Sequence, residues 1–525
     1  MRPALALPFL LLLAACARDQ ADAPPPAQEA GESIDVVELD LTGAAQLMAD
    51  GRVSSEALTQ AYLARIAEID DAGPTLNAVI EIAPDALEQA RRLDEERAAG
   101  RLRGPLHGIP VLVKDNIDAA GMVNSAGSLA LAGHRPAGDA FLVARLREAG
   151  AVILGKTNLS EWANFRSTRS SSGWSSRGGQ TRNPYVLDRN PCGSSSGTGA
   201  AIAASLATVG VGTETDGSIL CPSAVNGLVG LKPTVGLVSR DGIIPISISQ
   251  DTAGPMARTV ADAAALLQVL TAPDATDPAS FDAGAVDYLA GLEDASLAGK
   301  RIGVLRQAMG RHPDLDAATE RALEALRAGG AELVDVEVPG WGQWSSAEFE
   351  VLLYEFKDGL NAYLRESNAP VASLEALIAW NREHAGEVMP IFGQELLEQA
   401  QAKGGLDEPA YLEARARARR LALDEGLLAV LDGQSLDALV APTTGPAWPT
   451  DHVLGDRFLS AGYGIAAVAG TPSLTVPMGE LRGLPLGLAF LGRPRSEAEL
   501  LAMGHAFEQA TRARKPPAFS PTLAP

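Results

Sequence analysis

Metal-ligating side chains are scarce in this sequence of 525 residues, which contains three cysteines and six histidines. No pair of them has the spacing of metal ligands, so we expect neither a metal site nor a metal cofactor. Basic residues are also fewer than acidic residues, 43 against 65, which gives a formal net charge of −22. A surface of that sign repels phosphate backbones, which argues against a nucleic-acid partner.

The apolar run at the N-terminus, residues 5–14, is too short to cross a bilayer as a mature helix. It follows Arg2 and ends in Leu-Ala-Ala-Cys at Cys16, a pattern that resembles a bacterial lipoprotein signal. The resemblance implies cleavage of residues 1–15, lipidation of Cys16 and an anchor on the periplasmic side of a membrane. The alternative is an ordinary secretory signal and a soluble periplasmic or secreted protein. Residues 16–34 are expected to form a flexible tether rich in Ala, Pro, Glu and Gln.

The remaining residues, 35–525, alternate between expected strands and helices. Short apolar runs predict strands at 109–113, 151–154, 209–213, 228–231, 301–305, 332–338, 438–441, 474–476 and 486–491. Apolar residues at helical spacing predict helices at 41–70, 84–100, 139–148, 199–208, 317–327 and 497–511, with helices also resuming at 260. We therefore expect an α/β fold, a single large domain with a mixed central β-sheet covered by helices. The mostly helical residues 345–433 are expected to be a lid or insertion that shapes a pocket.

Lys114 is the first candidate for chemistry, because it ends the apolar strand predicted at 109–113. Burial lowers the pKa of a lysine, and a neutral amine can act as a general base near pH 7. Taken alone, the residue is more typical of a lysine at a strand end that extends to solvent and pairs with Asp115.

Two segments rich in serine and glycine follow, with Ser194 and Ser218 placed 24 residues apart. The first, Gly-Ser-Ser-Ser-Gly-Thr-Gly at 193–199, would bring hydroxyls together, although such a run is also typical of a linker or a phosphate loop. The second is Thr-Asp-Gly-Ser at 215–218. Adjacent amides in such a turn can bind an oxyanion, and the alternative is an ordinary Asp-Gly turn between strands.

At this point the sequence resembles the amidase signature hydrolases. The resemblance covers a signature core of about residues 104–258 and resumes at 437–443 and 469–477. It implies an amidase domain over 35–525 in which a Ser–cisSer–Lys triad acts without metal or cofactor. Lys114 then matches the base, Ser194 the bridging serine and Ser218 the nucleophile, and the amides of Thr215, Asp216, Gly217 and Ser218 match the oxyanion hole.

Several segments are similar to the bacterial peptide amidase branch of that family. They are residues 124–131, 159–165 and 236–245, together with Cys192 and the Thr-Asp-Gly form of the turn. The branch implies hydrolysis of the C-terminal carboxamide of peptides or amino-acid amides, with release of ammonia. The serine- and arginine-rich residues 166–180, with Trp174, would then line the peptide side of the cleft, unless they form a solvated loop.

Other interpretations stay open. Residues 193–197 also fit Gly-x-Ser-x-Gly with Ser195 as the nucleophile of an α/β-hydrolase, which would need a histidine such as His452 or His505. Within the family, other aliphatic or aryl amides, or one component of a tRNA-dependent amidotransferase, fit the same motifs. A peptide-binding lipoprotein with an inert triad is a further alternative. Whether Cys192 and Cys221 form a disulfide cannot be decided from spacing.

Overall fold

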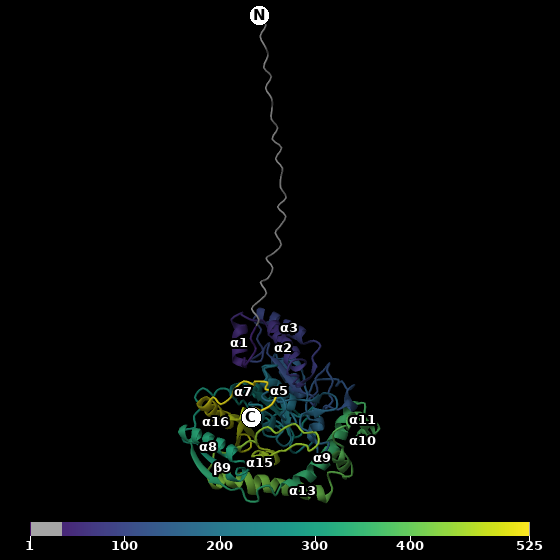
Figure 1. Ribbon diagram of the computed structural model, residues 1–525, viewed down its shortest axis with the longest axis vertical. Coiled ribbons are helices and arrows are strands. Elements are labelled where there is room, and N and C mark those ends of the chain that lie inside the picture. Colours follow the sequence, from purple (N-terminus) through teal and green to yellow (C-terminus); the bar gives the residue numbers. More distant parts are fainter. Residues whose placement is uncertain (2–33, 524–525) are drawn as a thin grey trace. The chain divides into compact units, whose positions relative to one another are not determined.

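Eleven strands form one mixed sheet in the computed structural model, which describes Met1 and residues 34–523. The order across the sheet is β1 (Val79–Ile82), β3 (Val152–Thr157), β2 (Pro110–Lys114), β6 (Val209–Glu214), β8 (Thr252–Ala257), β7 (Val229–Lys232), β12 (Ser473–Leu481), β13 (Leu484–Leu491), β11 (Ala438–Pro442), β9 (Arg301–Leu305) and β10 (Glu332–Val336). Helices cover this sheet (Figure 1). The predicted class, one large α/β domain with a mixed central sheet, is confirmed. Residues 2–15 of the predicted leader lie outside the described residues, as do Cys16 and nearly all of the tether that it begins.

Parallel pairing at the centre of the sheet positions the first candidate residue. Strand β2 lies between β3 and β6 and is parallel to both, with Val113 opposite Val211. The carboxyl ends of these strands therefore meet at one edge of the sheet, where β2 ends at Lys114 and β6 at Glu214. In open α/β sheets that edge is the usual place for a ligand site.

The α-helices outside residues 345–433 have the bounds α1 (Leu41–Ala49), α2 (Ser55–Arg65), α3 (Ala86–Ala98), α4 (Phe141–Glu148), α5 (Ser196–Ala203), α6 (Leu220–Val225), α7 (Val260–Leu270), α8 (Pro313–Ala328), α15 (Gly464–Ala469) and α16 (Glu497–Thr511). Strands of the sheet are contacted by α3 to α8 and α16, and α2 packs on α3. Helix α5 contacts β2, β3, β6 and β8, and all of its residues are buried. Its Ser, Gly, Thr and Ala side chains are small, so the helix approaches the sheet closely. Gly197 shows how closely, because a Cβ there would lie 2.3 Å from the carbonyl oxygen of Ala78.

Residues 345–433 are helical, as the sequence predicts. They form α9 (Ser345–Glu366), α10 (Leu374–Glu383), α11 (Ala385–Val388), α12 (Glu395–Gln401), α13 (Pro409–Arg419), the π-helix η5 (Arg420–Leu428) and α14 (Ala429–Gly433). Figure 1 draws this region in green, where α10 contacts both α9 and α11. Leu353, Phe356 and Leu360 of α9 pack in one apolar cluster with Phe165 and Ile246. The region therefore packs directly on segments that border the candidate site.

Some elements differ from the prediction. The helix expected at 41–70 is divided by a turn into α1 and α2, and the second continues as the π-helix η1 (Ile66–Asp70). Helix α5 begins at Ser196, three residues before the predicted start, and Ser195 at its N-cap position makes no side-chain capping hydrogen bond. Strands β1 and β8 were not predicted. None of the helices among residues 34–523 has the length and apolar character needed to span a bilayer.

Candidate active site

Lys114 lies at the carboxyl end of β2 with no solvent-exposed surface. Its Nζ is 2.7 Å from Ser194 Oγ, 2.8 Å from Thr213 Oγ1 and 3.2 Å from the carbonyl oxygen of Thr213. Burial lowers the pKa of Lys114 to about 7, although the negative charges of Asp251 and Glu214 oppose the shift. Because all three neighbours are neutral oxygens, the amine can lose its proton near neutral pH without breaking an ion pair.

Ser194 lies just before helix α5, and a cis peptide bond links it to Gly193. Its side chain is fully buried, and its carbonyl oxygen accepts a hydrogen bond of 3.1 Å from the amide of Ser160. A Cβ at Gly193 would lie 2.2 Å from Ser160 Oγ. Only glycine therefore fits beside Ser194, and the packing holds the hydroxyl against Lys114.

Ser218 ends a turn that follows β6. The carboxylate of Glu214 accepts hydrogen bonds from the amides of Ile219, at 2.7 Å, and Leu220, at 2.9 Å. These bonds fix the end of the turn. Gly217 has φ +81°, and a Cβ there would lie 2.2 Å from the ring of Tyr463. The amide of Ser195 donates to the carbonyl oxygen of Ser218 at 3.2 Å, so the two serine segments are directly joined.

A cavity of about 290 Å³ opens at this turn. Thr215, Asp216 and Ser218 line it on one side, next to Cys192 and Gly193. The rest of the lining is largely apolar and aromatic and consists of Ala163, Asn164, Phe165, Ser172, Ile246, Leu352, Trp448, Asp456, Phe458 and Tyr463. The sequence-predicted residues are therefore brought to the wall of one pocket or directly behind it.

A disulfide joins Cys192 to Cys221, with Cα atoms 6.0 Å apart. Cys192 lies two residues before Ser194, and Cys221 lies three residues after Ser218, within α6. The bond therefore links the segment of the bridging serine to the helix that follows the turn. This answers the question that residue spacing left open.

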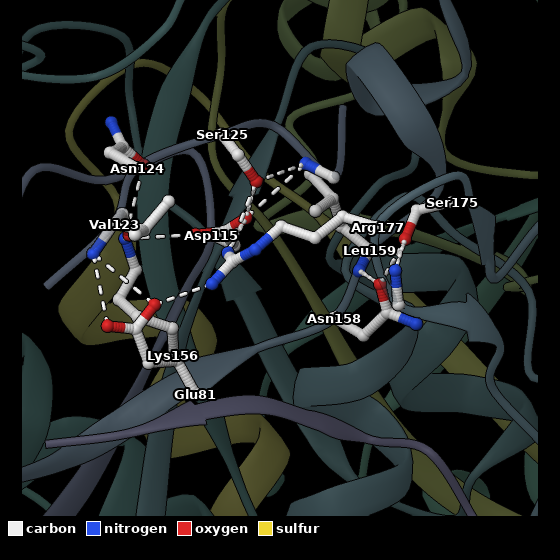
Figure 2. A network of polar contacts seen from close by, with 12 residues as sticks. Glu81, Asp115, Val123, Asn124, Ser125, Lys156, Asn158, Leu159, Ser175 and Arg177 are labelled. Atoms are coloured by element: carbon white, nitrogen blue, oxygen red, sulfur yellow. Dashed lines mark hydrogen bonds and ion pairs between the residues drawn. The ribbon is translucent and has the colours of Figure 1, made fainter. Parts of the chain in front are cut away.

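A buried network of charges adjoins Lys114 through the next residue, Asp115. Arg177 Nη1 lies 3.1 Å from Asp115 Oδ2, and Lys156 Nζ lies 3.4 Å from Asp115 Oδ1. Figure 2 shows Arg177 extending between Asp115 and Glu81, whose carboxylate it contacts at 2.5 Å. Ser125 also donates a hydrogen bond to Asp115. Two cations thus face two carboxylates beside the end of β2, which fixes the backbone that carries Lys114.

The sequence profile of the Amidase family matches residues 57–501. The chain belongs to the amidase signature family. A probable amidase of Arabidopsis thaliana is 42% identical over 483 residues, with 89% of each chain covered. One component of the glutamyl-tRNA(Gln) amidotransferase of Myxococcus xanthus is 37% identical, with 90% of this chain and 97% of the relative covered.

Solved structures place the chain near one branch of the amidase signature family. The native peptide amidase of Stenotrophomonas maltophilia is 58% identical and superposes with a TM-score of 0.89, covering 92% of this chain and 99% of its own. A peptide amidase in complex with the competitive inhibitor chymostatin is also 58% identical, with a TM-score of 0.90 and the same coverage. The chain is therefore an amidase-family hydrolase, close in structure to peptide amidase.

Two of the alternative interpretations disagree with this amidase geometry. Lys114 does not extend to solvent or pair with Asp115, because Lys156 and Arg177 occupy that carboxylate. Ser195 does not line the cavity, and its hydroxyl donates to the carbonyl oxygen of Thr213. His452 instead contacts Gln180, and His505 lies near Glu508, so neither is placed to serve Ser195.

Residues 166–180 are not a solvated loop, since Thr168 and Arg169 are the only two of them that are exposed. Ser172 is their only contribution to the lining of the cavity, and Trp174 instead packs on Phe392 with ring centroids 5.0 Å apart. Reasoning from sequence missed Thr213, which binds Lys114, and Leu352, Trp448 and Asp456, which line the pocket. The last three come from distant segments with no local motif. Among residues 34–523, no group of three or more His, Cys, Asp or Glu side chains is placed to hold a metal ion.

Proposed function

We propose that this amidase hydrolyses the C-terminal carboxamide of short peptides or amino-acid amides to the free acid and ammonia. The observation that carries the proposal is the contact of 2.7 Å between a fully buried Lys114 amine and Ser194 Oγ, behind the cavity that Ser218 lines. The 58% identity to peptide amidases supports the choice of substrate.

In the proposed acylation step, neutral Lys114 accepts the proton of Ser194, and Ser194 accepts the proton of Ser218. Ser218 Oγ then attacks the carbonyl carbon of the carboxamide. A hydroxyl is a poor nucleophile until its proton is removed, so the reaction depends on the low pKa of Lys114. Desolvation of the amine thus supplies a base that an exposed lysine would not supply at neutral pH.

The oxyanion formed by this attack is proposed to bind the amides of Thr215, Asp216, Gly217 and Ser218. Glu214 holds the far end of the turn through the amides of residues 219 and 220. Each donor aimed at the oxyanion is worth about 3–4 kcal/mol of barrier. Breakdown of the tetrahedral intermediate returns a proton from Lys114 through Ser194 to the leaving nitrogen, which departs as ammonia. Water, deprotonated by the same relay, then releases the acid from Ser218.

Within the family, two neighbouring activities compete with this choice. An amidase of other small aliphatic or aryl amides would use the same triad and cavity. Components of tRNA-dependent amidotransferases are relatives too, but at 37% identity rather than 58%. The acidic sequence, with its net charge of −22, favours a small amide over tRNA.

We further propose that the protein is exported and attached to the periplasmic side of a membrane by a lipid on Cys16. The proposal rests on the sequence of residues 1–16 alone. Metabolic labelling with a fatty acid, followed by mass analysis of the N-terminal peptide, tests it. A mature chain that keeps residues 1–15, or an unmodified Cys16, would contradict it.

The function is tested by ammonia release from an amidated dipeptide, compared with an aryl amide and a fatty amide of equal concentration. We expect the dipeptide amide to give the highest kcat/KM. Higher kcat/KM on the aryl or fatty amide would reject the peptide assignment while leaving amide hydrolysis in place. Ser218→Ala, which keeps the cavity, serves as the control for background hydrolysis.

A further inference from the structure

The cavity beside Ser218 has two carboxyl side chains in its wall. Asp216 and Asp456 line it, and within residues 34–523 no Lys, Arg or His does. Asp456 is held by hydrogen bonds from Trp448 Nε1 and Asn190 Nδ2, both at 3.1 Å, and from the amide of Ser172 at 3.0 Å. Burial raises the pKa of Asp456, and these donors oppose that shift by favouring its charged form. The other lining side chains are neutral, so the ionised forms of Asp216 and Asp456 give the pocket its negative charge.

Asp216 is the part of this wall nearest to the chemistry. It lies between Thr215 and Gly217 in the turn that leads to Ser218, and it is the exposed residue of that turn. Its carboxyl lies beside that of Glu348 on α9. Gln250 Nε2 donates to Glu348 Oε1 at 3.0 Å and to the carbonyl oxygen of Thr215 at 3.3 Å. The helical region thereby holds an acid pair, Asp216 and Glu348, against the turn.

We propose that this acid pair determines specificity by charge: it admits neutral carboxamides, disfavours an acidic side chain beside the scissile bond, and promotes release of the carboxylate product. The inference rests on the proposed function. Hydrolysis turns a neutral amide into an acid whose new charge forms at Ser218, two residues from Asp216 in the chain. Like charges that lie close together in one pocket repel each other, whereas the neutral amide is unaffected. The neutral substrate and the negatively charged product therefore differ in charge, and the acid pair responds to charge.

The charge of the pair depends on pH. The surrounding protein desolvates the carboxyl of Asp216, although the residue keeps an exposed surface at the cavity, and so raises its pKa to about 7. The negative charge of Glu214 adds to this shift, and Lys232 opposes it. Burial and the charge of Asp216 raise the pKa of Glu348 well above its usual value. The remaining ionisable group that faces them is Tyr463, whose pKa is raised by burial. As the pH rises through about 7, the pair loses a proton and gains negative charge, so discrimination against anions should increase.

The test compares two dipeptide amides that differ only in a C-terminal residue of glutamine or glutamate. For the wild-type protein we expect kcat/KM to favour the glutamine substrate by about tenfold or more, by an amount that grows between pH 6 and 8. Asp216→Asn should reduce that ratio severalfold, and both Asp216→Asn and Glu348→Gln should remove its growth with pH, because Glu348→Gln leaves Asp216 ionised across this range. Asp216→Asn should also tighten inhibition by the peptide acid product. Asp424→Asn, at an exposed position of η5, is the matched control and should change neither quantity.

The outcomes separate the two proposals. If the wild-type protein hydrolyses neither amide, the proposed function fails. If it hydrolyses both, and Asp216→Asn and Glu348→Gln leave the ratio and the product inhibition constant within twofold of the wild-type values, the charge proposal is overturned while the function stands. Because each ratio is taken within one variant, a general loss of activity does not affect it.

Discussion

Lys114 Nζ lies 2.7 Å from Ser194 Oγ, and neither side chain has any exposed surface. This contact links the burial of the Lys114 amine to its pKa, and that pKa to activation of the serine nucleophile. An amine in water at pH 7 is almost fully protonated and cannot accept a proton, whereas this one has a pKa of about 7 because it is desolvated. The proposed mechanism therefore predicts how activity responds to substitution at 114 and to pH.

Replacement of Lys114 by methionine should reduce kcat by about 10⁴-fold or more, because the relay then has no terminal base. Lys114→Arg should be equally inactive, since a guanidinium keeps its proton at any accessible pH. Steady-state ammonia release measures both, with circular dichroism to confirm folding. Substantial activity in Lys114→Arg would show that the residue acts through its charge and not as a base.

The pH profile of kcat/KM should follow the protonation of Lys114. The amine must be neutral to act, so kcat/KM is expected to fall about tenfold per pH unit below about 7 and to level off above it. Measurement with an amide that lacks ionisable groups isolates the enzyme's own titration. A profile that is flat from pH 5 to 8 would contradict a lysine base.

Asp115→Asn should destabilise the fold more than a typical buried substitution. It leaves Lys156 and Arg177 with one carboxylate fewer in a buried site, a loss that costs about 3–5 kcal/mol. Ser125→Ala, which removes only a hydrogen bond to the same carboxylate, should cost about 1–2 kcal/mol. Chemical denaturation gives both values. Equal effects would mean that the ionic character of the network in Figure 2 is unimportant.

Removal of the disulfide should lower both stability and turnover. The double variant Cys192→Ser with Cys221→Ser frees a loop closed across 29 positions, which costs about 3.6 kcal/mol in the chain-entropy model. Turnover should fall as well, because the bond joins the segments of Ser194 and Ser218. Treatment of the wild-type protein with a reductant should reproduce both effects, and the double variant should not respond to it. Unchanged stability on reduction would contradict this role.

Much of the fold could be predicted from the sequence because the pattern of apolar residues is local. The strand at 301–305 and the helix at 497–511 have the predicted bounds. Strand β8 could not be found that way, since Thr252–Ala257 contains Gly254 and Pro255 in a run of small residues. It is a strand only because β6 and β7 pair with it on either side. Tertiary pairing there overrides a weak local preference.

In the candidate site too, residues in local motifs could be predicted from the sequence, and residues placed by tertiary packing could not. Lys114, Ser194 and Ser218 stand in local motifs, so they could be singled out before any contact was known. Glu348 and Asp456 could not, because a lone acidic residue on a helix or in a loop has no local signature. Each becomes part of the site only through packing, Glu348 against Gln250 and Asp456 against Trp448.

The most direct test of the central claim is covalent trapping. The protein is treated with a serine-directed acylating or phosphonylating inhibitor, and the modified peptide is mapped by mass spectrometry. The account predicts a single adduct at Ser218, no adduct in Ser218→Ala, and much slower labelling in Lys114→Met. Labelling at Ser195 or at another residue, or full turnover by Ser218→Ala, would contradict it.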